Sequence, residues 1–184
     1  MAFADGENLV ARYQAVLAAG TATPKRDTLH EKDIYVWNQA FTIQARQSYE
    51  ILRVTYYTSA VGDDSRLADI RRTIRSFTFA RHSGSTLPNQ LCATVIKRPA
   101  NARAAKGVDI QLCVEALSHV HSGNVDGILL LTGDGDYIPL IDEARRAGVQ
   151  VYLAAFSNGL NPSLLDHVDT FLELDGLTYD SVVV

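Results

Sequence analysis

A continuous apolar run, Gly127-Ile128-Leu129-Leu130-Leu131, leads directly into the glycine-spaced acidic turn Thr132-Gly133-Asp134-Gly135-Asp136. Unbroken apolarity over a short segment is typical of a central parallel strand that is buried on both faces. An acidic turn at the end of such a strand places charged chemistry at one edge of the sheet. The pattern therefore predicts an α/β fold with a mainly parallel sheet and a candidate site at that edge.

The rest of the chain alternates apolar runs with segments of helical period, as expected for a parallel sheet covered by helices. A short first strand is predicted to lead into Asp5, and a helix to run from Leu9 to Gly20. The other predicted strands are 49–60, 92–96, 149–156 and 170–174, and the other predicted helices are 63–80, 106 onward, 137–148 and 162–167. Two segments fit the alternation less well. Residues 81–91 indicate a loop, and residues 21–48, with the run Tyr35-Val36-Trp37, indicate an insertion that forms a small hairpin or a lid.

Composition limits the class of protein. The 184 residues are 47% hydrophobic and 21% charged, which suits one globular domain over residues 1–184. No apolar run is long enough to cross a bilayer, and the N-terminal residues lack the features of a signal peptide. Cys92 and Cys113 have no metal-binding or redox spacing and indicate small buried residues in a reducing compartment. We therefore expect a cytoplasmic protein with no membrane partner.

The net charge of −4 argues against a protein that coats nucleic acid nonspecifically, although it does not exclude a nucleic-acid enzyme. The sequence leaves the oligomeric state open, a homo-oligomer included. The apolar tail Val182-Val183-Val184 could pack on a partner or simply fray.

Four aspartates are expected to meet at one edge of the sheet. Ligands of open α/β sheets bind beyond the carboxyl ends of the strands, where the strand order reverses. Asp5 ends the first strand, Asp134 and Asp136 follow the central strand, and Asp109 lies in the first turn of a helix that follows the 92–96 strand. Gathered carboxylates repel one another unless a cation or protons compensate, and oxygen ligands of this kind suit Mg²⁺ or Mn²⁺. Such an ion can activate water and stabilise a phosphoryl transition state.

Each acid also has a purely structural explanation. Asp5 or Asn8 could cap the first helix, and Asp136 could cap the helix that contains Pro139. Asp109 could interact favourably with a helix dipole. Their convergence on one edge is what predicts a metal site.

Three blocks of the chain have a recognisable order: Phe3-Ala4-Asp5-Gly6-Glu7-Asn8-Leu9, Lys106-Gly107-Val108-Asp109-Ile110, and Leu131-Thr132-Gly133-Asp134-Gly135-Asp136-Tyr137-Ile138-Pro139-Leu140. In this order they resemble the NYN domains, a branch of the PIN-like nucleases. Gly148-Val149-Gln150-Val151 and Asp169-Thr170-Phe171 are similar to the closing strands of that family.

The resemblance implies a PIN-like three-layer α/β/α sandwich and metal-dependent hydrolysis of RNA. It implies catalytic, metal-binding roles for Asp5, Asp109, Asp134 and Asp136 with Mg²⁺ or Mn²⁺, and substrate-binding roles for Asn8, Lys106 and Thr132. Thr132 stands where the family often has serine, so the hydroxyl is kept. Glu115 stands where many relatives have aspartate. Six helical residues rotate it by about 240° and raise it ~9 Å from Asp109, so the two are not expected to bind one ion.

Two alternatives to the ribonuclease remain. A HAD-like phosphatase is weakly suggested by Gly133-Asp134-Gly135-Asp136, but Asp5-Gly6-Glu7-Asn8 lacks the second aspartate of that family's first motif. The stronger alternative is a non-catalytic PIN-like module that binds RNA or a protein partner. The complete set of four aspartates favours the ribonuclease.

Overall fold

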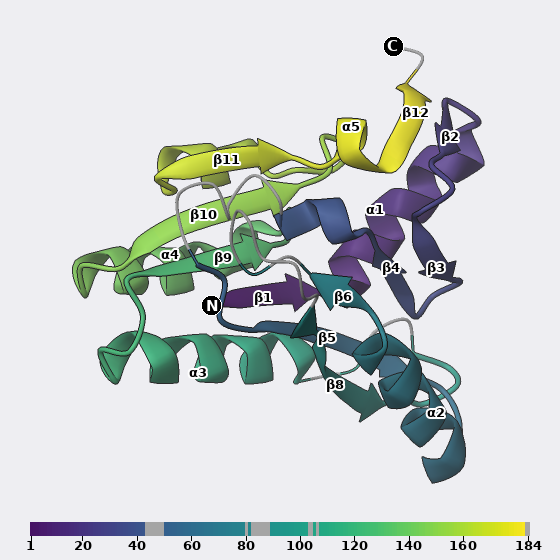
Figure 1. The fold of residues 1–184 in the computed structure, drawn as a ribbon, viewed down its shortest axis with the longest axis horizontal. Coiled ribbons are helices and arrows are strands. Elements are labelled where there is room, and N and C mark those ends of the chain that lie inside the picture. Colours follow the sequence, from purple (N-terminus) through teal and green to yellow (C-terminus); the bar gives the residue numbers. More distant parts are fainter. Residues whose placement is uncertain (43–49, 80, 82–88, 103–104, 106, 183–184) are drawn as a thin grey trace.

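The computed structural model describes residues 1–42, 50–79, 81, 89–102, 105 and 107–182, and its centre is a six-stranded sheet (Figure 1). The strands are β1 (Ala2–Asp5), β5 (Val54–Ala60), β8 (Cys92–Lys97), β9 (Gly127–Leu131), β10 (Gln150–Ala155) and β11 (Thr170–Glu173). Their order in space is β11-β10-β9-β1-β5-β8, and every neighbouring pair is parallel. The mainly parallel sheet predicted from the sequence is therefore confirmed.

The strand order reverses between β1 and β9. From β1 the chain proceeds outward through β5 to β8, and α3 (Val108–His121) then carries it back to β9, on the other side of β1. β10 and β11 continue outward from β9. Ligand sites of open α/β sheets lie at such a reversal, outside the carboxyl ends of the strands. Asp5 and Thr132 stand at those ends.

Helices cover both faces of the sheet, which gives three layers. One hydrophobic core joins the sheet to α1 (Gly6–Ala19) and α2 (Asp64–Arg75), and the other joins it to α3 and α4 (Ile138–Arg146). The two-residue period of a strand assigns the side chains. Ala2 and Ala4 of β1 belong to the first core and Phe3 to the second. The predicted α/β/α sandwich is confirmed.

Residues 29–37 form an antiparallel hairpin of β3 (Leu29–Glu31) and β4 (Tyr35–Trp37). The Trp37 side chain is 1% exposed and belongs to the core beneath α1 and α2. Its indole N–H donates to the carbonyl of Thr78 at 3.1 Å. The hairpin is thus anchored by its aromatic residues. That residues 21–48 are an insertion stays a prediction, and residues 43–48 lie outside the described part of the chain.

Several predicted boundaries are wrong. The strand expected at 49–60 begins only at Val54. The helix expected at 63–80 ends at Arg75, because the following aromatic and β-branched residues pair as β6 (Thr78–Phe79) with β7 (Asn89–Gln90). The helix expected from residue 137 is a 3₁₀ turn, Gly135–Tyr137, followed by α4, whereas the helix expected from about residue 106 is found as predicted and begins at Val108. The short helix near 162–167 is the 3₁₀ helix Pro162–Asp166.

The C-terminal part contains elements that the sequence pattern did not indicate. After β11 come α5 (Asp175–Thr178) and β12 (Tyr179–Val182), and β12 pairs antiparallel with β2 (Ala22–Pro24). The last two valines of the apolar tail, for which packing on a partner and fraying were both left open, lie outside the described residues. Within the described residues, no helix combines the length and apolarity needed to cross a membrane.

Candidate functional site

Thr132 links two of the predicted acids at the strand reversal. Its hydroxyl donates to Oδ2 of Asp5 at 3.0 Å and accepts from the backbone N–H of Asp134 at 3.2 Å. Asp5 is 3% exposed, whereas Asp134 is half-buried. The threonine hydroxyl is therefore a bridge between the buried acid at the end of β1 and the acid turn that follows β9.

Asn8 joins the first turn of α1 to the same acid turn. Its backbone N–H donates to Oδ1 of Asp5 at 3.1 Å, which makes Asp5 the N-cap of α1. Its side-chain oxygen accepts from the backbone N–H of Gly133 at 2.9 Å. The Asn8 amide oxygen is thus committed to the protein, so its role in this structure is to hold the acid turn in place.

Asp109 reaches the site from the other covering layer. It lies in the first turn of α3, and its Oδ1 accepts a hydrogen bond from the Tyr137 hydroxyl at 3.1 Å. Tyr137 is buried, while Asp109 itself is exposed. Burial, followed by the charges of Asp5 and Asp109, raises the pKa of Tyr137, so its hydroxyl stays a donor at physiological pH.

The charge of Asp5 is held in an unfavourable environment. Burial raises its pKa to about 6, and the charges of Asp109 and Glu7 act in the same direction. The hydrogen bonds from Asn8 and Thr132 oppose the shift without cancelling it. A bound cation would stabilise the ionised form, because an opposite charge close to a carboxylate lowers its pKa.

Asp134 and Asp136 form a capping pair. The Asp134 side chain accepts from the backbone N–H of Asp136 at 3.0 Å and caps the 3₁₀ turn Gly135–Tyr137. The sequence suggested a helix-capping role for Asp136. In the structure Asp134 is the capping residue, and it caps the 3₁₀ turn before α4. Asp136 does not cap α4, whose N-cap residue, Tyr137, makes no side-chain cap, and the Asp136 side chain is exposed.

The acids suit a hard divalent cation by their chemistry but do not form a closed cage. Within the described part of the chain, no three histidine, cysteine, aspartate or glutamate side chains are grouped closely enough to hold a metal ion. Mg²⁺ usually binds one or two carboxylates and keeps several waters, so a closed protein cage is not required. Asp5 fits such an open site, because the negative charge of Asp109 acts on it and the Thr132 hydroxyl links it to Asp134.

Glu7 is a site residue that we did not predict. Its Oε1 accepts from the Ser59 hydroxyl at the end of β5 and from the backbone N–H of Ala105 at 3.3 Å. It thereby ties Ala105, which precedes α3, to α1. The sequence signal was its place inside the Asp5-Gly6-Glu7-Asn8 motif, two residues after Asp5 and directly before Asn8.

Two other predicted positions lie apart from these contacts. Lys106, the predicted phosphate contact, lies outside the described residues. Glu115 accepts from the Thr55 hydroxyl at 3.4 Å, in line with the expectation that helical rotation separates it from Asp109. The cysteines, expected to be buried, are free and only partly buried. Burial and the nearby charges of Asp109 and Asp5 raise the pKa of Cys113, so its thiol stays protonated.

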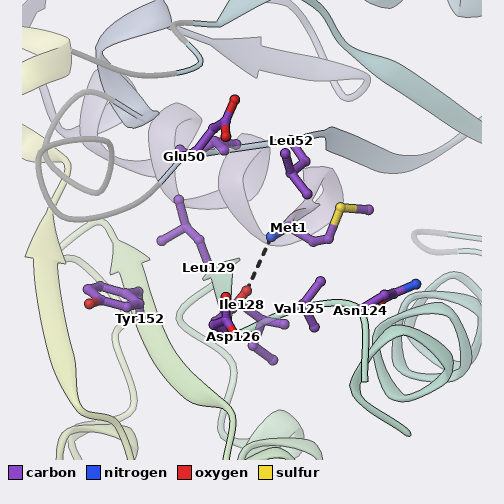
Figure 2. A pocket seen from close by; sticks show the side chains of 11 residues that line it. Met1, Glu50, Leu52, Asn124, Val125, Asp126, Ile128, Leu129 and Tyr152 are labelled. Carbon is purple, nitrogen blue, oxygen red and sulfur yellow. Dashed lines mark hydrogen bonds between the residues drawn. The ribbon is translucent and has the colours of Figure 1, made fainter. Parts of the chain in front are cut away.

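An apolar hollow lies at the opposite edge of the sheet. Its volume is about 190 Å³, and Leu129, Tyr152 and Met1 are among the residues that line it. The Met1 amino group donates to the carbonyl of Gly127 at 3.2 Å, and the dashed line that leaves Met1 in Figure 2 marks this hydrogen bond. The hollow is at the amino-terminal ends of the strands, so it is separate from the acids at their carboxyl ends.

Comparisons with known proteins agree with this architecture. The family model of the NYN domain matches residues 1–175. Over 87 residues, 47% of this chain, the sequence is 26% identical to MJ0482, an uncharacterized protein of Methanocaldococcus jannaschii. That match covers 36% of MJ0482, so the chain aligns with little more than a third of this relative.

A solved structure is similar along almost the whole chain. The crystal structure of VPA0982, a protein of unknown function from Vibrio parahaemolyticus, superposes with a TM-score of 0.60 at 18% sequence identity. The superposition covers 97% of this chain and 93% of that one. At this identity the likeness supports the fold alone. The family match over residues 1–175 confirms the resemblance seen in the motifs, and this chain belongs to the NYN domain family, a group of PIN-like, nuclease-type domains.

Proposed function

We propose that the protein is a metal-dependent ribonuclease that hydrolyses RNA phosphodiester bonds at the acidic edge between β1 and β9. The observation that carries this proposal is the bridge from buried Asp5 through the Thr132 hydroxyl to Asp134, at the reversal of strand order. Family membership supports the reaction class, because NYN domains are generally ribonucleases.

The proposed roles follow from the positions of the side chains. Asp5, Asp109, Asp134 and Asp136 would hold Mg²⁺ or Mn²⁺, with Asp5 as the buried anchor. When bound, the ion would activate water and offset the negative charge that develops on the phosphoryl group. Thr132 and Asn8 position the acid turn, Tyr137 orients Asp109, and Glu7 holds Ala105 before α3. Lys106 would contact a phosphate of the substrate.

The competing candidate is a PIN-like module that binds RNA or protein without cleaving it. The exposure of Asp109 and Asp136, and the lack of a closed acid cluster among the described residues, are the observations that favour it. The raised pKa of Asp5 supports catalysis, because carboxylates with strongly perturbed pKa values are concentrated at functional sites.

The test is cleavage of single-stranded and structured RNAs by the wild-type protein and Asp134→Asn, with Mn²⁺, Mg²⁺ or EDTA. Asp126→Asn is a matched control, because Asp126 is exposed and precedes β9 at the opposite edge of the sheet. We expect metal-dependent cleavage by the wild type and Asp126→Asn and a loss of at least about 100-fold in Asp134→Asn. No cleavage by the wild type, or equal cleavage by all three proteins, would favour the non-catalytic binding module over the ribonuclease.

A further inference from the structure

Arg12 lies beside the acid turn, on the same face of α1 as Asn8. The two residues are four apart, so they are neighbours on the helix surface, with a rise of about 6 Å between them. Asn8 contacts Gly133 directly. Arg12 is therefore about one helical turn from the proposed site, along the surface of α1.

The loop after β10 covers the Arg12 side chain. The backbone N–H of Asn161 donates to the carbonyl of Gly133 at 2.9 Å, which holds residues 157–161 beside the acid turn. A Cβ atom at Gly159 would lie 2.3 Å from Nη1 of Arg12 and 2.6 Å from its Nε. Gly159 also has a φ of +76°, which favours glycine. The guanidinium is thus packed against bare backbone at a position where a larger residue would displace it.

Arg12 has no acidic partner among the described residues. Its Nε is buried and makes no hydrogen bond there. By contrast, each of the following arginines forms an ion pair with an acid: Arg66, Arg72, Arg81, Arg145 and Arg146. Arg12 is half-buried, so it loses part of its hydration without the compensation that a carboxylate provides.

An anion from outside the chain would supply that compensation. A guanidinium binds phosphate through several N–H groups at once, and it keeps its charge at any physiological pH. The neighbouring acids repel a polyanion, so a strand that enters this edge needs a cation close by to hold its backbone. Arg12 is placed for this role, and the Gly159 backbone restricts the side chain beforehand.

We propose that Arg12, whose guanidinium packs against the Gly159 backbone, forms a phosphate subsite that holds an RNA phosphate next to the one being cleaved. The assignment rests on the proposed ribonuclease function. The subsite also defines the path of the RNA, which would run from the acid turn along the face of α1 that carries Asn8 and Arg12. Arg12 is a binding residue for the neighbouring phosphate and has no part in the bond-breaking step.

The first experiment measures binding of a single-stranded RNA oligonucleotide in EDTA, by fluorescence anisotropy at several salt concentrations. We expect Arg12→Gln to weaken binding about 10-fold and to reduce the slope of log K against log salt by ~0.7, the value for one phosphate contact on a single strand. Arg12→Lys should keep the slope but recover only part of the affinity. Arg53→Gln removes the same charge from an exposed position before β5, at the far edge of the sheet, and should bind as the wild type does.

The second experiment compares cleavage of RNA with that of bis(4-nitrophenyl) phosphate, which has a scissile phosphodiester but no neighbouring phosphate. Arg12→Gln should lose about 10-fold in kcat/KM on RNA, mainly through KM, and should match the wild type on the small diester. Equal RNA binding and unchanged salt slope in Arg12→Gln would overturn the subsite alone. An equal loss on both substrates would also overturn it, whereas a wild type that neither binds nor cleaves RNA would overturn the ribonuclease as well.

Discussion

The Thr132 hydroxyl donates to Asp5 across the β1–β9 junction, at a distance of 3.0 Å. The two residues are 127 positions apart in the sequence, and each ends or follows a strand at the point where the strand order reverses. Because the same hydroxyl accepts from the Asp134 N–H, one small side chain fixes the relation between the buried acid and the acid turn.

Thr132→Val tests this bridge. Valine keeps the shape of threonine but leaves Asp5 without one of the two hydrogen bonds that lower its pKa. We expect the free energy of unfolding at pH 7 to fall by about 1–3 kcal/mol, the cost of an unsatisfied buried group. The rising limb of the cleavage pH profile should also move to higher pH. Urea unfolding and a pH–rate profile measure the two effects. Thr170→Val, at an exposed position of β11, should change neither one.

Asp5→Asn should stabilise the metal-free protein at neutral pH. The pKa of Asp5 is raised from 3.8 to about 6 in the folded state, so the folded protein holds a proton that the unfolded chain has released. The stabilisation from this proton is complete below about pH 4 and is lost as the pH rises through about 6. Asparagine removes the buried charge, so the gain at pH 7 is expected to be about 1–3 kcal/mol.

Urea titrations in EDTA at pH 4.5 and pH 7.5 give the comparison. The difference between Asp5→Asn and the wild type should be larger at pH 7.5. A variant that is less stable than the wild type at both pH values would show that the carboxylate is stabilised in the fold without a metal. Cleavage should be lost in the same variant, because asparagine is a poor ligand for the ion.

Tyr137→Phe should release Asp109 from its fixed orientation. The Tyr137 hydroxyl is the donor that holds Oδ1 of Asp109 at 3.1 Å. We expect a loss of about 1 kcal/mol in stability and a severalfold higher Mn²⁺ concentration for half-maximal cleavage. Tyr13→Phe is the matched control, because that ring is buried against Tyr179 in the other core. If both variants respond equally to Mn²⁺, the Tyr137 hydroxyl does not orient a metal ligand.

Gly6→Ala should destabilise the fold at the first turn of α1. A Cβ atom there would lie 2.6 Å from the carbonyl oxygen of Tyr57 and 2.3 Å from the Tyr56 ring. Backbone cannot move as a flexible side chain can, so we expect a loss of about 2–4 kcal/mol in thermal or urea unfolding. Gly176→Ala is the control, since nothing lies within 4 Å of the added atom. A small effect at Gly6 would mean that α1 can shift away from β5.

The sequence predicted the elements in which one local signal dominates. Gly127–Leu131 was placed correctly because five apolar residues between turn residues have one reasonable interpretation. The end of α2 was missed because the sequence from Phe77 to Phe79 is compatible with a helix as well as a strand, and pairing with the distant residues Asn89 and Gln90 decides between them. Strand β12 was missed for the same reason, since its partner β2 lies near the other end of the sequence.

The candidate site was predicted in part. Ligand sites of open α/β sheets lie beyond the carboxyl ends of the strands, and this rule predicted Asp5, Asp134 and Asp109 at one edge. The charge of Asp109 does act on Asp5, whose pKa it helps to raise. The rule could not say which acid is buried, nor that the Asn8 side chain would be used by Gly133. The roles of three residues were not predicted, because they depend on contacts between elements far apart in sequence: Glu7, Tyr137 and Arg12.

The central position of β1 has a consequence for how the chain matures on the ribosome. One side of β1 pairs with β5, but its other side must wait for Leu129 to Leu131 of β9. At about 5–20 residues per second, synthesis of the stretch from Ala60 to Leu131 takes on the order of 10 s. During that interval a nascent β1–β5–β8 sheet would have an open, apolar edge, which is a template for pairing with other chains. The strand that carries Asp5 at the candidate site is thus also a strand whose edge stays unpaired until β9 emerges.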